Sequence, residues 1–167
     1  MGLLGETKPV KKPILGVSLY PEQESMEEIE NYLTMASRYG FTKIFTSMFS
    51  VPGTKEEVFD YFKNFCDLAH KHVMKVSGDC NTAFFKKMGA SESDISIFKE
   101  MGIDIIRMDL PYFDQRDVTL INNPYNITIE LSSCMIQAVR MALENGANPK
   151  NFSTCHNFYP ERYTASD

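Results

Sequence analysis

The chain has 167 residues, of which 43% are hydrophobic, 12% aromatic and 23% charged. This length can bury one sizeable core, and the composition is that of a soluble globular protein rather than a disordered chain. The net charge of −5 argues against a nucleic-acid partner, because a phosphate backbone needs a basic face, but it leaves room for a small phosphorylated ligand. No run of 18 apolar residues is present, so we expect no membrane partner.

The N-terminal stretch 1–12 lacks the apolar run of a signal peptide, and we expect it to be a flexible leader. None of the four cysteines belongs to a C-x-x-C pair, which speaks against a zinc ribbon and a dithiol redox motif. Reduced thiols of this kind are typical of a cytoplasmic protein, and this is the location that we expect.

Short β-branched runs alternate along the chain with longer amphipathic stretches. The predicted strands are 14–20, 42–47, 73–79, 104–109, 126–131 and 152–156. The predicted helices are 25–39, 54–72, 81–88, 93–101 and 133–145, with Ser25, Thr54 and Ser93 as expected N-caps. The stretch 110–125 carries no predicted element.

The predicted strands follow one another at intervals of roughly 30 residues, which is the length of a βα unit and requires parallel strands. A doubly wound open sheet and a (β/α)8 TIM barrel both fit this rhythm. The turn after the first strand has no glycine fingerprint for a dinucleotide, which favours the barrel.

Polar residues stand where each predicted strand ends, and in a barrel these ends form the active-site face. The residues concerned are Tyr20, Glu22, Ser47, Asp79, Asp109, Glu130, His156 and Asn157. The period of two predicts that Arg107 points inward with Asp109, Thr128 with Glu130, and Thr154 with His156. We therefore expect a single ligand pocket; the plainer alternative is that polar residues merely begin the loops.

Several segments resemble a known family: ILGVSLYPEQES, YGFTKIFTSMFS, IDIIRMD, ITIELS and above all CHNFYPERYT, which begins at Cys155. In this order and spacing they are similar to the bacterial 6-phospho-N-acetylmuramidases of the MupG type. These proteins were long described as outer surface proteins or as a domain of unknown function. The resemblance covers residues 13–165.

The resemblance implies a (β/α)8 glycosidase domain followed by a small β-rich C-terminal domain. It also implies hydrolysis of N-acetylmuramic acid 6-phosphate–N-acetylglucosamine in the cytoplasm, during peptidoglycan recycling. Because such a barrel takes about 250 residues, we expect 13–167 to be an incomplete N-terminal TIM-barrel domain of about six βα units. Self-association through unpaired strand edges is a further expectation.

Glycoside hydrolysis usually needs two carboxyl groups. Asp109 and Glu130 end consecutive predicted strands, and we expect them to form the catalytic pair. Two alternatives stay open: one of them binds a sugar hydroxyl while the other pairs with Arg107, or Glu22 or Asp79 is the catalytic partner. The sequence does not assign the acid and the base.

The remaining candidates are substrate-binding residues. Arg107 could bind a phosphate or the lactyl carboxylate, or it could pair structurally with Asp79. The family motif implies ligand contacts for His156 and Asn157, and the rings of Tyr20 and Tyr159 could stack on a sugar or belong to the core. Ser47 completes the set.

We expect no metal and no cofactor, because no second histidine is placed near His156. A sugar-phosphate aldolase or isomerase is disfavoured, because no strand-end lysine suits a Schiff base. The main alternative to a hydrolase is a partial barrel that binds a sugar or a partner without turnover.

Overall fold

The computed structural model describes residues 13–108, 114–132 and 136–155. Within these ranges it contains one sheet of six parallel strands in the order β1-β2-β3-β4-β5-β6. The strands are β1 Gly16–Ser18, β2 Lys43–Ser47, β3 Lys75–Asp79, β4 Ile105–Met108, β5 Thr128–Ser132 and β6 Phe152–Cys155. The helices are α1 Met26–Arg38, α2 Lys55–Lys71, α3 Thr82–Lys87, α4 Ser96–Met101, α5 Gln115–Ile121 and α6 Ile136–Glu144, and a 3-10 turn η1 spans Pro21–Gln23.

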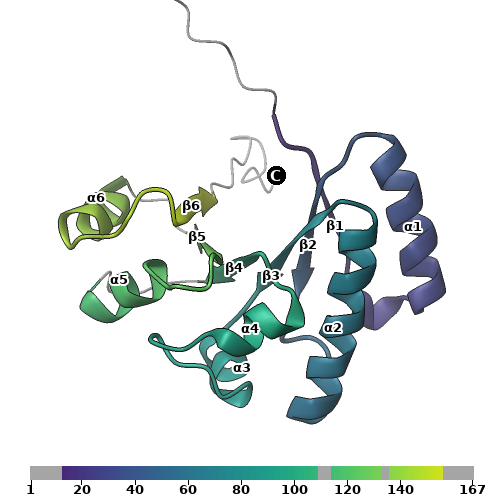
Figure 1. The fold of residues 1–167 in the computed structure, drawn as a ribbon, viewed down its shortest axis with the longest axis horizontal. Coiled ribbons are helices and arrows are strands. Elements are labelled where there is room, and N and C mark those ends of the chain that lie inside the picture. Colours follow the sequence, from purple (N-terminus) through teal and green to yellow (C-terminus); the bar gives the residue numbers. More distant parts are fainter. Residues whose placement is uncertain (1–12, 109–113, 133–135, 156–167) are drawn as a thin grey trace, which may run out of the picture.

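The order of the strands in space is their order along the chain, and every pairing is parallel. In a doubly wound sheet this order would reverse at a switch point. Figure 1 shows the helices following one another in an arc around the strands, from α1 through α4 to α6. The fold is therefore of the TIM-barrel type, as predicted from the sequence.

The first two long helices begin where the sequence predicts. Ser25 accepts a hydrogen bond from the backbone N–H of Glu28, whose carboxylate accepts one from the N–H of Ser25 in return. Thr54 and Glu57 form the same reciprocal capping box at the start of α2. Both helix starts are thus set by residues only three positions apart.

Two local predictions are wrong. Helix α5 was not predicted; Asp114 caps it by accepting hydrogen bonds from the backbone N–H groups of Arg116 and Asp117. Ser93 does not cap α4, because the N–H of Ser96 donates to the carboxylate of Asp94 instead. The residue types at both positions were informative, because Asp is a preferred N-cap residue as well as Ser.

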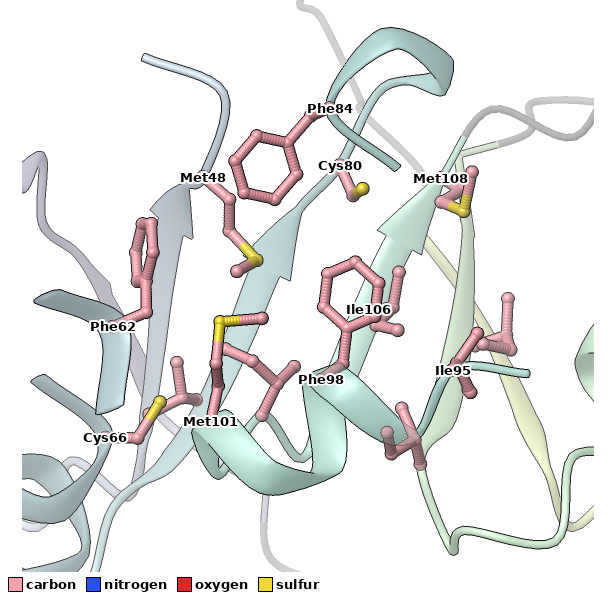
Figure 2. Packing of buried hydrophobic residues seen from close by; sticks show 14 of the residues in the cluster. Met48, Phe62, Cys66, Cys80, Phe84, Ile95, Phe98, Met101, Ile106 and Met108 are labelled. Carbon is pink, nitrogen blue, oxygen red and sulfur yellow. The ribbon is translucent and has the colours of Figure 1, made fainter. Parts of the chain in front are cut away.

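The hydrophobic core lies between the sheet and the arc of helices. Figure 2 shows the side chains of Phe62 from α2 and of Phe98 and Met101 from α4 on the same side of the strands as Met48 and Ile106. All five are fully buried. None of the helices in the described part is long and apolar enough to cross a membrane.

Candidate active site on the concave face of the sheet

One row of polar side chains crosses the sheet on the face opposite the core, which we call the concave face. The register pairs Ser47 with Asp79, Asp79 with Arg107, Arg107 with Glu130, and Glu130 with Ser153. The residues that alternate with them on β4 and β5 belong to the core: Ile106, Met108, Ile129 and Leu131. Three residues of the row, Ser47, Asp79 and Glu130, are among those predicted at strand ends. Arg107 was predicted to point inward, and the structure brings all four together on one face.

Glu130 makes the shortest contact on this face. Its Oε1 accepts a hydrogen bond from Nζ of Lys43 at 2.7 Å, and the two side chains are 11% and 26% exposed. Lys43 is the first residue of β2, three strands away. Barrel strands are tilted, so the start of one strand comes level with the middle of another.

Lys43 is a residue that the sequence analysis missed. The signal was present, because Lys43, Phe45 and Ser47 alternate along one strand and must share a face. With Ser47 predicted inward, Lys43 follows from the same period. Its partner could not have been found, because 87 positions separate it from Glu130.

Arg107 lies across the sheet toward β2. Its guanidinium carbon is 5.2 Å from the centre of the Phe45 ring, a cation–π contact that spans β3. Ser77, on the intervening strand, is the register partner of Phe45 and is fully buried. In the register Arg107 stands between two acids, Asp79 and Glu130, so this part of the face carries both charges.

The end of β1 is held against the end of β2. The hydroxyl of Ser50 lies 3.0 Å from the Glu22 carboxylate, and the hydroxyl of Tyr61 donates to the carbonyl of Pro21 at 3.3 Å. Burial and the negative charge of Glu22 raise the pKa of Tyr61 to about 12, so the phenol stays protonated as a donor. Glu22 is therefore fixed near Ser47, because Ser50 follows that strand end by three residues.

Tyr20 is half-exposed and lines a cavity of about 360 Å³ between β1 and α1, together with Ser18, Ile29 and Tyr32. This cavity lies at the β1 edge of the sheet. Neither Asp79 nor Glu130 lines this cavity, so Tyr20 is not grouped with them.

A second cavity, of about 240 Å³, opens at the carboxyl ends of β3 and β4. It is lined by Phe49, Asp79, Cys80, Asn81, Thr82 and Met108. Burial and the charge of Asp79 raise the pKa of the Cys80 thiol to about 12, so this thiol stays protonated and is no nucleophile. Asn81 accepts from the N–H of Phe84 and caps α3. Asp79 is the one carboxylate among the residues that line this cavity.

Four predicted site residues lie outside the described part: Asp109, His156, Asn157 and Tyr159. Asp109 directly follows Met108, the last residue of β4. On β6 the parity prediction for Thr154 is wrong, because Thr154 pairs with Leu131, which faces the core. The inward residue is Ser153, the partner of Glu130, which the prediction missed because it took the strand one residue out of phase.

Metal ligation finds no support in the described ranges, where no three His, Cys, Asp or Glu side chains are grouped to hold an ion. The concave face instead offers carboxylates, hydroxyls and two cations. Such groups suit a polar ligand that carries both hydroxyls and negative charge.

The family profile described as "6-phospho-N-acetylmuramidase, N-terminal" matches residues 15–167. No curated protein sequence matches significantly. An uncharacterized B. cereus protein of known structure is 33% identical, with a TM-score of 0.73; the alignment covers 92% of this chain and 41% of that protein.

Two further structures resemble the chain in fold. One is a conserved protein of unknown function from a locus in Enterococcus faecalis, 21% identical with a TM-score of 0.70, aligned over 91% of this chain and 41% of that protein. The other is a truncated 3-deoxy-D-arabino-heptulosonate 7-phosphate synthase from Thermotoga maritima, 13% identical with a TM-score of 0.54, aligned over 88% of this chain and 53% of that one. The chain thus spans about two-fifths of the length of the first two structures.

Proposed function

Because the chain belongs to the 6-phospho-N-acetylmuramidase family, we propose that it hydrolyses N-acetylmuramic acid 6-phosphate–N-acetylglucosamine. In this proposal the reaction takes place in the cytoplasm and serves peptidoglycan recycling. The observation that carries it is the family match over 15–167. The polar row on the concave face supports it, because a barrel binds its substrate at the carboxyl ends of its strands.

The proposed catalytic pair is Glu130 with Asp109. Glu130 stands on the concave face of β5, and Asp109 follows the neighbouring strand β4. Glycosidases place two carboxyl groups about 5 to 9.5 Å apart on either side of the scissile bond, one giving a proton to the leaving oxygen. Two residues on adjacent strands are compatible with that span.

Arg107 is the proposed anion-binding residue for this substrate, which carries a phosphate and a lactyl carboxylate. Its guanidinium lies over the Phe45 ring, so this contact already restricts its position before a ligand arrives. Ser47, Asp79 and Glu22 would bind sugar hydroxyls, and Tyr20 would offer a ring at the β1 edge. His156, Asn157 and Tyr159 keep their proposed ligand contacts from the family motif.

The test is release of N-acetylglucosamine from the disaccharide by the purified protein, with D109N and E130Q beside it. We expect each substitution to lower kcat by about 10²- to 10⁴-fold, since each removes a proton-transfer or charge-stabilising group. The matched control is E100Q, because Glu100 is an exposed acid on α4, away from the concave face. Circular dichroism spectra must be superimposable for all four proteins.

A second candidate is a module that binds the sugar without turnover. The chain spans 41% of the length of each of the first two structures described above. The polar row on the concave face can bind sugar hydroxyls whether or not turnover follows. Calorimetric titration with the disaccharide separates the two: binding without release by the folded protein would overturn the hydrolase proposal and support the module.

We also propose that copies of the chain associate through their sheet edges. Within the described residues, β1 and β6 are the two edges of the sheet. The segment before β1 and the helix α1 with its C-cap carry exposed apolar residues: Ile14, Leu15, Tyr32, Met35 and Tyr39. Sedimentation should show mass rising with concentration; a monomer with a sharp, concentration-independent melt would contradict this.

A further inference from the structure

The ion pair of Lys43 and Glu130 is the feature of the concave face that the proposed chemistry does not yet use. Its N–O distance is 2.7 Å, and the carboxylate is mostly buried. An ion pair removed from water persists only where its geometry and further hydrogen bonds offset the loss of hydration. Because this pair includes a proposed catalytic carboxyl group, it can affect the proposed reaction.

The charges around Glu130 differ from those expected for a proton donor. The register neighbour on β4 is Arg107, a second cation, and the neighbour on β6 is Ser153. A carboxyl group that must keep its proton is found in apolar surroundings or beside another acid. Glu130 is instead flanked by positive charge from β2 and β4.

The hydrogen bond between Lys43 and Glu130 leads to the same conclusion. An ammonium group has donors only, so Oε1 of Glu130 must be the acceptor. A proton on this carboxyl group could then sit only on Oε2, beside a full positive charge. The geometry therefore fits a carboxylate, not a carboxylic acid.

We propose that Lys43 is a positioning residue that holds Glu130 as a fixed carboxylate, so that Glu130 is the ionised member of the catalytic pair and Asp109 the proton donor. This inference rests on the proposed function and assigns the two roles within it. Lys43 itself touches Glu130 rather than the reacting atoms.

The proposed hydrolysis can be written with retention or with inversion of configuration at C1. Glu130 gives an electron pair to C1 of the muramic sugar, or it accepts a proton from the water that attacks C1. In the same step the C1–O bond breaks, its electron pair stays on the leaving oxygen, and Asp109 gives that oxygen a proton. Where Glu130 has bonded to C1, water then attacks C1 and gives a proton to Asp109, and the Glu130–C1 bond breaks, which restores both carboxyl groups. Water is the only other reactant that the hydrolysis consumes.

The role of each carboxyl group is tested by changing the leaving group. E130Q and D109N are compared on the disaccharide and on 4-nitrophenyl 6-phospho-N-acetylmuramoside, whose phenolate leaves without a proton. We expect D109N to regain rapid release of 4-nitrophenolate, as continuous turnover in the inverting course or as a burst in the retaining course, and E130Q to regain none. Recovery of E130Q on the aryl substrate would overturn the assignment.

The role of Lys43 is tested with K43M and K43R. We expect K43M to lower kcat on both substrates by about 10- to 100-fold with KM unchanged, since small displacements of a catalytic group have effects of this size. K43R keeps the charge and should restore most of the turnover. The matched control is K75M, because Lys75 is the register partner of Lys43 and is exposed.

Two results would overturn the role of Lys43: full kcat in K43M, or K43R as inactive as K43M while its melting temperature is normal. The failure of the proposed function looks different, because the unmodified folded protein would then cleave neither substrate. In that case a double-mutant cycle of K43M and E130Q in urea still tests the pair. Strictly additive shifts of the unfolding midpoint would overturn it.

Discussion

The two faces of the parallel sheet carry different kinds of side chain. On the face toward the helices, Ile44, Val76, Ile106 and Ile129 are fully buried and pack into the core. On the concave face, the same strands present Lys43, Ser77, Arg107 and Glu130. Because side chains alternate along a strand, one short segment serves both faces. The helix-side residues stabilise the fold by packing in the core, and the residues on the concave side supply the charged groups.

The largest expected effect comes from the helix side. Phe98 is fully buried and stacks on Phe85, with 5.6 Å between the ring centres. F98A should lower the free energy of unfolding by about 3–5 kcal/mol, because it removes a large apolar side chain and leaves a cavity. Urea unfolding measures this. F49A, which truncates an exposed phenylalanine, is the matched control and should cost far less.

Adding a single methyl group to the helix side of β3 is the next test. A Cβ at Gly78 would collide with Sδ and Cγ of Met48, while a Cβ at Gly16 would meet Lys43 at an ordinary 3.4 Å. G78A should destabilise the protein by about 1–3 kcal/mol. G16A should stay within about 0.5 kcal/mol. Equal losses in the two variants would show that the collision is not the cause.

The buried thiol of Cys80 predicts a dependence on pH. Its pKa is raised from 9.0 to about 12, chiefly by burial, so the folded protein keeps a proton that the unfolded chain releases. Stability from this group is intact below pH 9 and falls as the pH rises from 9 toward 12. Between pH 8 and pH 10 the loss should be about 1 kcal/mol.

Thermal unfolding of the unmodified protein and of C80A at pH 8 and pH 10 measures this loss. C80A should lose less stability than the unmodified protein over the same interval. An identical loss in both would rule out a contribution of this thiol.

The smallest effect is expected on the concave face. The hydroxyl of Ser77 is fully buried and makes no hydrogen bond within the described residues. S77A should change the free energy of unfolding by less than about 0.5 kcal/mol or stabilise the protein, because it removes a polar group that gains nothing from burial. A loss above about 1 kcal/mol in urea would show that the hydroxyl has a partner in solution.

Much of the architecture is readable from local patterns. The βα rhythm, the capping boxes at Ser25 and Thr54, and the alternation that turns Arg107 and Glu130 to one face all depend on residues a few positions apart. Helix α5 was not predicted, although Asp114 at its N-cap is a local signal of the same kind. The phase of β6 was wrong because a strand of four residues has little alternation to read.

By itself, the sequence determined which segments form strands and helices, that the strands are parallel, and which polar residues stand at their ends. These properties follow from spacing, caps and periods of a few residues. Only the tertiary structure decided that the Lys43 ammonium meets the Glu130 carboxylate and that Arg107 reaches over β3 to Phe45. Such pairs depend on the tilt and curvature of the whole sheet, which no local pattern encodes.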